Sequence, residues 1–290
     1  MNNRKKYTNK LNDLSGKEWI KFTKSWFIHR PPPREKKKLL HPAAFPETLV
    51  REFIEFFTKR KQLVLDPFLG TGSTLLACIQ SNRCGVGIEV VKKWTEIAKK
   101  RVGDLLAQKR GSEQMATLMG LESNRILIEV IHGNSKRLSQ IWKERKFSPV
   151  DYCITSPPYW NQLKRSYIRQ KTRVRKGLAT KYSDEEEDIG NIDDYGGFLG
   201  ATKQIFNEVY KIMKNQGYLT VITNNVFFNG RVFPLAFDTT RILSDEPYPW
   251  VPKDERIWLQ NDKPLIPLGV YSAYVGNRHH QYCLIFRKEE

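Results

Sequence analysis

The sequence predicts an α/β protein whose doubly wound sheet is mostly parallel and is closed by a C-terminal antiparallel hairpin. Short apolar runs at residues 62–66, 84–89, 126–132 and 150–156 have the length of buried strands. Segments between the first three runs have the periodicity of helices, so strand and helix alternate at the spacing of βαβ units. Such units connect parallel strands by right-handed crossovers, which is the basis of a doubly wound sheet.

Further elements follow from local patterns. Residues 46–60 place Leu49, Phe53, Phe56 and Phe57 on one helical face. Helices are also predicted at 73–80, 91–107 and roughly 195–214, and a strand is predicted at 217–223. In the tail, the runs VYSAYV (270–275) and QYCLIF (281–286) have the alternation of an antiparallel hairpin, which we expect at the edge of the sheet.

The charge balance is the most informative feature of the composition. The 290 residues carry 49 Lys and Arg against 31 Asp and Glu, a net charge of +18. A polyanion such as nucleic acid is the expected partner, because neutralised phosphates release counterions.

We expect no membrane partner, since there is no run of 18 apolar residues and no secretory signal. Four cysteines without paired spacing predict neither a disulfide framework nor a metal site, and they favour the cytoplasm.

Residues 1–40 form a basic aromatic arm, which we separate from the main domain at 41–290. The arm has twelve basic and three acidic side chains, interleaved with Trp19, Phe22, Trp26 and Phe27. A disordered tail would rarely hold so many aromatic residues, so the arm is expected to pack on the body of the protein.

A glycine-rich turn links the first strand to its helix, with the sequence Asp66-Pro67-Phe68-Leu69-Gly70-Thr71-Gly72-Ser73-Thr74. Gly70 and Gly72 let the backbone turn sharply, and the start of the helix offers free N–H groups. Glu89 ends the second strand nineteen residues after Gly70, where it can accept hydrogen bonds from both hydroxyls of a ribose. A nicotinamide-binding function is still possible at this point. However, Leu75 occupies the place of the third glycine in the dinucleotide-binding fingerprint.

The fourth strand ends in the hexapeptide Thr155-Ser156-Pro157-Pro158-Tyr159-Trp160. Ligands of doubly wound sheets bind at the carboxyl ends of the strands, so this segment should face the glycine turn. The Ser156 hydroxyl and the Pro157 carbonyl can both accept hydrogens from one amino group, and Tyr159 can stack on a base. Such a segment is often only a proline turn, but its place at a strand end favours a functional role.

With this hexapeptide the sequence resembles the amino-methyltransferase family, whose members carry (Asp/Asn/Ser)-Pro-Pro-(Tyr/Phe) at this place. The resemblance spans about residues 39–225 and implies a Rossmann-like methyltransferase fold, S-adenosylmethionine as the methyl donor and an S-P-P-Y subgroup. It also implies direct methyl transfer without a metal. The catalytic residues implied are Ser156, Pro157, Pro158 and Tyr159, and the cofactor-binding residues implied are His41, Pro42, Phe45, Asp66, Phe68, Gly70, Thr71, Gly72, Ser73, Glu89 and Asn134.

We expect the substrate to be double-stranded DNA and the target to be the N4 amine of cytosine, because Ser156 stands where adenine-specific members more often carry Asp or Asn. Adenine N6, an RNA base, and a nucleic-acid-binding protein with a vestigial pocket are the alternatives. Cys153 suggests attack on cytosine carbon 5, but its mid-strand position predicts a buried packing residue instead. The sequence does not determine whether a cognate restriction endonuclease exists, nor does it determine the oligomeric state.

A recognition insertion is predicted at residues 161–194. Eight basic residues crowd positions 164–181 directly after the hexapeptide, and an acidic run follows at 184–188. The expected DNA contacts are Trp160, Lys164, Arg165, Arg169, Lys171, Arg173, Arg175 and Lys176. A solvated loop is the alternative, because runs of charge are usually solvated.

Overall fold

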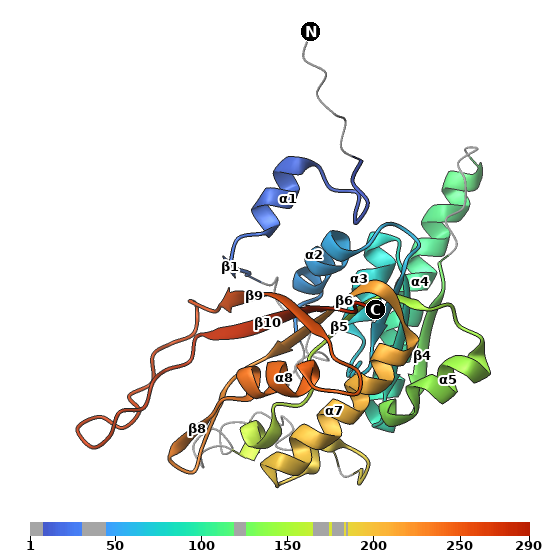
Figure 1. Ribbon diagram of the computed structural model, residues 1–290. Coiled ribbons are helices and arrows are strands. Elements are labelled where there is room, and N and C mark those ends of the chain that lie inside the picture. The colour runs from blue at the N-terminus through green and yellow to red at the C-terminus, as the bar shows by residue number, and fades with distance from the viewer. Residues whose placement is uncertain (1–7, 31–44, 119–125, 165–173, 176–182, 184) are drawn as a thin grey trace.

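An eight-stranded sheet forms the centre of the computed structural model, which describes residues 8–30, 45–118, 126–164, 174–175, 183 and 185–290 (Figure 1). In spatial order its strands are β1 (Trp26–Ile28), β9 (Val251–Leu259), β10 (His280–Arg287), β6 (Met213–Thr223), β5 (Val150–Thr155), β2 (Leu63–Asp66), β3 (Cys84–Glu89) and β4 (Ile128–His132). The helices are α1 (Gly16–Phe22), α2 (Glu47–Phe57), α3 (Ser73–Ser81), α4 (Lys92–Leu118), α5 (Leu138–Arg145), α7 (Tyr195–Ile212) and α8 (Leu235–Ser244).

The parallel part of the sheet is doubly wound. Strands β2, β3 and β4 run outward in one direction through α3 and α4, and β5 and β6 run outward in the other through α5 and α7. The direction of winding therefore reverses between β2 and β5, which pair with each other in parallel. The predicted fold class is confirmed, and ligands of such sheets bind at this switch point.

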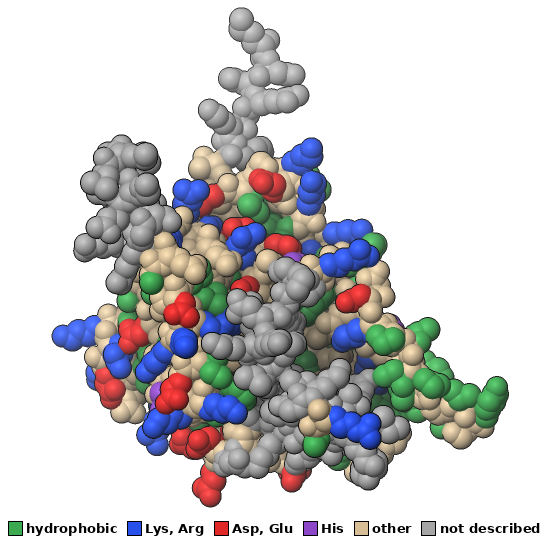
Figure 2. All heavy atoms as spheres, turned by 180° about the vertical axis from the view of Figure 1, so that it is seen from behind, with side chains coloured by type: hydrophobic (Ala, Val, Ile, Leu, Met, Phe, Trp, Pro, Cys, Tyr) green, Lys and Arg blue, Asp and Glu red, His purple; other side chains and the backbone are tan. Residues whose placement is uncertain are grey.

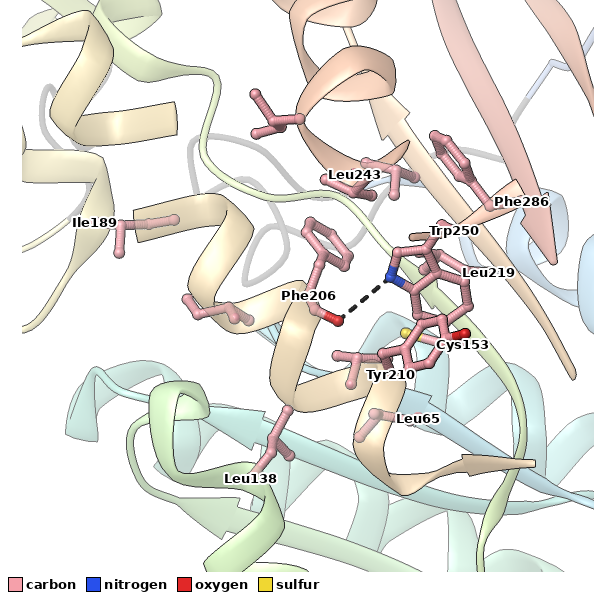
Figure 3. Close-up of a cluster of buried hydrophobic side chains, with 14 of the residues drawn as sticks. Leu65, Leu138, Cys153, Ile189, Phe206, Tyr210, Leu219, Leu243, Trp250 and Phe286 are labelled. Atoms are coloured by element: carbon pink, nitrogen blue, oxygen red, sulfur yellow. Dashed lines mark hydrogen bonds between the residues drawn. The ribbon is translucent and has the colours of Figure 1, made fainter. Parts of the chain in front are cut away.

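Helices cover both faces of the sheet, with α2 and α3 on one side and α7 and α8 on the other (Figure 1). Successive residues of β2 show the two layers: Val64 packs in a cluster with Phe53 of α2, and Leu65 packs in a cluster with Phe206 of α7. In the second cluster the Trp250 indole donates a hydrogen bond to the Phe206 carbonyl at 3.4 Å (Figure 3). Burial on both faces explains why these strands are continuous apolar runs.

The C-terminal hairpin is present, but the predicted partner and place were wrong. Strand β10 lies between β6 and β9, antiparallel to both, and is not at the edge. Its hairpin partner comes from residues 251–259, and residues 270–275 form no strand. Gly269 and Tyr271 have φ values of +62° and +61°, so the backbone turns there and the alternating apolar residues pair with no strand.

The described part of the N-terminal arm is built into this sheet. Strand β1 is the edge strand and pairs in parallel with β9. Helix α1 stacks its Phe22 ring on Phe56 of α2, with centroids 3.9 Å apart. The Arg256 guanidinium of β9 lies 4.0 Å from the Phe22 centroid and 4.4 Å from that of Phe27. The expectation that the arm packs on the body is confirmed for residues 8–30.

Across the part of the chain that the structure describes, no helix combines the length and apolar character needed to span a bilayer.

We predict that Phe22→Ala lowers the free energy of unfolding by about 1–3 kcal/mol, less than the ~3–5 kcal/mol typical of a fully buried phenylalanine. The substitution removes the stack on Phe56 and one aromatic contact of Arg256. Urea unfolding measures the loss. Ile20→Ala is the matched control, because Ile20 lies on the same helix and is 73% exposed. Equal effects of the two substitutions would contradict a packing role for the arm.

Candidate active site

Asp66 and Thr155 join the carboxyl ends of β2 and β5 at the switch point. The Thr155 hydroxyl donates to Asp66 Oδ1 at 2.6 Å, and the Thr74 hydroxyl at the start of α3 donates to Oδ2 at 2.5 Å. The Phe68 N–H adds a third hydrogen bond to Oδ1 at 3.0 Å. Burial raises the pKa of Asp66 to about 6, although all three donors oppose that rise. Asp66 has no exposed surface and is not among the residues that line the neighbouring cavity, so it positions the turn rather than contacting a ligand.

A cavity lies between the glycine turn and the S-P-P-Y segment. Six of the predicted site residues line it, namely Phe68, Gly70, Glu89, Asn134, Ser156 and Pro158. Other residues that line the cavity were not predicted from the sequence, among them Trp94, Ser135, Glu187, Asp188, Ile189 and Ile205. The acidic run was placed in the predicted recognition insertion, with a solvated loop as the alternative. In the structure Asp188 is buried, and it accepts hydrogen bonds from the Gly190 N–H and the Ser183 hydroxyl. No pattern in the sequence shows that this segment returns to the cavity.

The backbone of the glycine turn bends sharply at the two predicted glycines. Gly70 and Gly72 have φ values of +55° and +90°, a region that other residues rarely adopt. A Cβ at Gly72 would also lie 3.2 Å from the Cβ of Ala98 on α4. Thr71 and Ser73 are buried and do not line the cavity; the Thr71 carbonyl accepts a hydrogen bond from Arg101. Of the turn, Pro67, Phe68 and Gly70 line the cavity.

Glu89 lines the cavity, and two backbone N–H groups hold its carboxylate in place. Its Oε2 accepts from the Gly70 N–H at 2.7 Å, and its Oε1 accepts from the Val91 N–H at 2.9 Å. Burial raises the pKa of Glu89 to about 7, and the negative charge of Asp188 adds to the rise. Each carboxylate oxygen has a second lone pair, so Glu89 can still accept two hydrogens from a ligand.

A chain of three side chains fixes the S-P-P-Y segment. The Tyr159 hydroxyl donates to Gln281 Oε1 of β10 at 3.0 Å and lies 2.8 Å from Ser156 Oγ. Because the phenol hydrogen is used on Gln281, the Ser156 hydroxyl donates to Tyr159, which leaves both Ser156 lone pairs able to accept. Tyr159 is only 7% exposed, so its ring presents no open face for stacking in this structure. Pro157 is buried beside it.

The other predicted residues have varied positions. Phe45 packs beside α2, and His41 and Pro42 lie outside the described residues. Asn134 caps the 3₁₀ helix η2 (Ser135–Arg137) by accepting from the Lys136 N–H. Cys153 is fully buried and burial raises the pKa of its thiol, which agrees with its rejection as a nucleophile.

The structure does not support a DNA contact for Trp160. Its side chain is 4% exposed, packs against Phe233 with centroids 4.4 Å apart, and donates to the Asp193 carbonyl at 3.0 Å. Lys164 ends the 3₁₀ helix η3 (Trp160–Lys164), and Arg175 is exposed. The remaining predicted DNA contacts, Arg165, Arg169, Lys171, Arg173 and Lys176, lie outside the described residues.

Comparison with known proteins agrees with this geometry. Residues 1–100 match the family model of N6- and N4-methyltransferases, described as DNA methylase. The Type II methyltransferase M.HpaI of Haemophilus parainfluenzae is 31% identical over 146 residues, which are 50% of this chain and 44% of that protein. The Type II methyltransferase M.MjaI of Methanocaldococcus jannaschii is 36% identical over 89 residues, 31% of this chain and 29% of that protein.

The family model covers the first 100 of the 290 residues, so the likeness to amino-methyltransferases is shown for that part of the chain. The chain covers less than half of the length of these curated relatives. Among solved structures, TrmN from Thermus thermophilus superposes with a TM-score of 0.44 and 12% identity, over 83% of this chain and 48% of that one.

S-adenosylmethionine is the methyl donor of the amino-methyltransferase family, and the cavity fits it. Glu89 supplies two free lone pairs for the ribose hydroxyls, beside the apolar side chains of Phe68 and Ile205. Glu187 and Asp188 add negative charge to the cavity wall, which favours a ligand that carries a sulfonium and an ammonium group.

We predict that Thr155→Val lowers the free energy of unfolding by about 1–3 kcal/mol at about pH 8, and by less at about pH 5. With its pKa near 6, Asp66 is ionised at the higher pH and largely neutral at the lower one. The raised pKa means that the burial of Asp66 costs stability as pH rises through about 6, and losing the Thr155 donor increases that cost.

Urea unfolding at the two pH values measures this difference. Thr220→Val is the matched control, since Thr220 is equally buried on β6 but accepts from the uncharged Tyr152 hydroxyl at 2.8 Å. Its cost should be about 1 kcal/mol at both pH values. A cost for Thr155→Val that is the same at both would show that Asp66 does not bear the charge at this junction.

Proposed function

We propose that this protein is an S-adenosylmethionine-dependent DNA methyltransferase of the S-P-P-Y subgroup, acting on the N4 amine of cytosine. One observation carries the proposal: Glu89 and the S-P-P-Y residues Ser156 and Pro158 line the same cavity. A carboxylate suited to a ribose and an acceptor suited to an amine therefore meet in one space. Holding two reactants in such a space is the main device available for direct group transfer.

The bound donor would supply an electrophilic methyl group on its sulfonium. The chain's own residues would align the amine. Ser156 Oγ, with both lone pairs open, and the Pro157 carbonyl accept the two amine hydrogens, which draws the nitrogen lone pair away from the aromatic ring. Ser156 acts as an acceptor and aligner, not as a general base, because the proton leaves only after the nitrogen has become positively charged.

DNA is the substrate we favour. The net charge of +18 suits a polyanion, and two relatives are named as Type II methyltransferases. A restriction endonuclease as a partner and action in the cytoplasm belong to the same proposal. Adenine N6 is the second candidate for the target, because the alignment of an amine by Ser156 and Pro157 would serve either base.

We predict that the affinity for 5′-methylthioadenosine rises by about tenfold between about pH 6 and pH 8. This ligand has the ribose and adenine of the donor but no amino-acid group that titrates near neutrality. Its ribose hydroxyls need the ionised form of Glu89, whose pKa is about 7 in the free protein. Titration calorimetry measures the affinity. Glu89→Gln should bind more weakly and show no such pH dependence; a parallel pH dependence in this variant would assign the titration to another group.

We predict that Ser156→Ala lowers kcat by about 10²–10³-fold while the affinity for S-adenosylmethionine changes by less than about twofold. The substitution removes an acceptor of the amine but leaves Glu89 and the glycine turn intact. Nucleoside mass spectrometry of DNA treated with the wild-type protein and cofactor should give N4-methylcytosine. N6-methyladenine as the sole product would contradict the choice of base, and the absence of both products would contradict the activity.

A further inference from the structure

Trp160, the residue directly after the S-P-P-Y segment, has an unusual backbone conformation. Its φ value is +43°, in the left-handed region that bulky residues rarely adopt. The Gln162 N–H donates to the Tyr159 carbonyl at 3.0 Å, so the chain turns tightly at this point. A strained residue of this kind persists only where its surroundings enforce the conformation, and such residues often lie beside functional sites.

The surroundings of the Trp160 indole are an aromatic cage, which we define by three rings. The ring centroids lie 4.9 Å away for Tyr195 of α7, 5.3 Å away for Phe228 of β7 (Val226–Phe228) and 4.4 Å away for Phe233 of β8 (Arg231–Phe233). Tilted and edge-on rings at these distances attract one another beyond the effect of burial alone. The cage therefore fixes the indole from a helix on one side and a hairpin on the other.

The burial of this indole sets it apart from the apolar side chains on the surface. Exposed apolar residues gather on the projecting lobe formed by residues 260–279 (Figure 2), among them Leu265, Tyr271 and Tyr274. The same lobe and Phe228 of the cage line a second cavity, of about 600 Å³. Trp160 packs inside the protein instead, so a function for it must act through its neighbours.

Polar contacts tie the turn at Trp160 to the start of α7. The Trp160 Nε1–H donates to the Asp193 carbonyl at 3.0 Å, and the Asn161 amide donates to the same carbonyl at 3.4 Å. The Tyr195 hydroxyl in turn donates to Asp238 of α8 at 2.7 Å. The cage thus rests on the two helices that cover one face of the sheet (Figure 1).

The S-P-P-Y segment lies between two anchors. Before the segment, the Thr155 hydroxyl donates to Asp66 at the switch point. After the segment, the cage holds Trp160. Between these anchors the Tyr159 hydroxyl is the hydrogen-bond partner of Ser156. A shift of the chain at Trp160 would therefore move Tyr159 and, through it, the hydroxyl that accepts an amine hydrogen in the proposed reaction.

The cofactor side of the site is held independently of the cage. Backbone N–H groups of Gly70 and Val91 fix the Glu89 carboxylate, and both belong to other segments of the chain. Loss of the cage should therefore disturb the alignment of the amine and leave the binding of the cofactor intact.

We propose that Trp160 is a positioning residue for methyl transfer: its caged indole keeps the backbone after Tyr159 in the left-handed conformation and thereby holds Ser156 where it aligns the amine. Trp160 lines neither cavity, so it acts through the S-P-P-Y segment rather than on a ligand. This inference rests on the proposed function and extends it to a residue outside the segment.

Substitution of Trp160 tests the inference, with transfer of a radiolabelled methyl group into unmodified DNA as the readout. Trp160→Ala empties the cage and should lower kcat by about 10–100-fold, while the affinity for S-adenosylmethionine changes by less than about twofold. Trp160→Phe keeps a ring in the cage and should retain kcat within about threefold of the wild-type value. A purely structural role would not separate kcat from cofactor affinity in this way.

The effect on kcat should vanish when Ser156 has lost its hydroxyl. If Trp160 acts through Ser156, the double variant with Trp160→Ala and Ser156→Ala should have the kcat of Ser156→Ala alone within about threefold. Losses that multiply in the double variant would show that Trp160 does not act through Ser156 and would overturn the inference.

Trp142 provides the matched control. Its indole is 5% exposed, packs against Phe147 with centroids 4.9 Å apart and donates to the Ser148 carbonyl at 2.9 Å. It lies on α5 and lines neither cavity. Trp142→Ala should lower Tm, but kcat measured well below Tm should stay at the wild-type value.

Hydrogen exchange tests the anchoring without an assay of activity. Trp160→Ala should accelerate exchange of the amides at residues 159–162 by about tenfold or more and leave the glycine turn unchanged. Unchanged exchange at 159–162, or equal losses of kcat in Trp160→Ala and Trp142→Ala, would overturn the inference even if the protein methylates DNA. Absence of methyl transfer by the wild-type protein, with the expected exchange, would instead reject the proposed function and leave Trp160 as the residue that holds the segment.

Discussion

Three hydrogen bonds to the buried Asp66 carboxylate hold the ends of β2 and β5 together, and the site depends on this junction. A carboxylate without solvent would be strongly disfavoured if its oxygens were unpaired. The donors are the Thr155 hydroxyl on β5, the Thr74 hydroxyl on α3 and the Phe68 N–H of the turn itself. The Asp66 side chain therefore fixes the relative positions of these three segments. The glycine turn and the S-P-P-Y segment begin directly after these anchored residues, which is why they face the same cavity.

The two cavities follow from where the S-P-P-Y segment leaves the sheet. It starts at the switch point, turns at Pro157 and Pro158, and is held at Tyr159 by Gln281 from the antiparallel strand β10. On the cofactor side stands Glu89, an acid held by backbone N–H groups. On the other side stand amide and cationic groups. The antiparallel hairpin thus does more than extend the sheet, because it positions the tyrosine and supplies a wall of the second cavity.

The region around the S-P-P-Y segment contains buried polar groups whose burial destabilises the folded protein. The pKa values of Asp66 and Glu89 are raised to about 6 and about 7, and the amide oxygens of Gln162 and Asn224 have no partner. A protein selected for stability alone would replace such groups with apolar side chains. These polar groups gather around one segment. The clusters on the two faces of the sheet consist instead of packed apolar side chains.

The sequence by itself determined the parallel half of the sheet, the glycine turn, Glu89 and the S-P-P-Y segment, because each depends on local periodicity or on backbone conformations that only certain residues adopt. Tertiary structure decided what depends on contacts between distant segments. Examples are the place of β10 inside the sheet, the return of Asp188 to the cavity, the burial of Trp160 and the pairing of Thr155 with Asp66. The alternation in 270–275 predicted a strand, but a strand also needs a neighbour with free N–H and C=O groups, and no local pattern records whether the fold provides one.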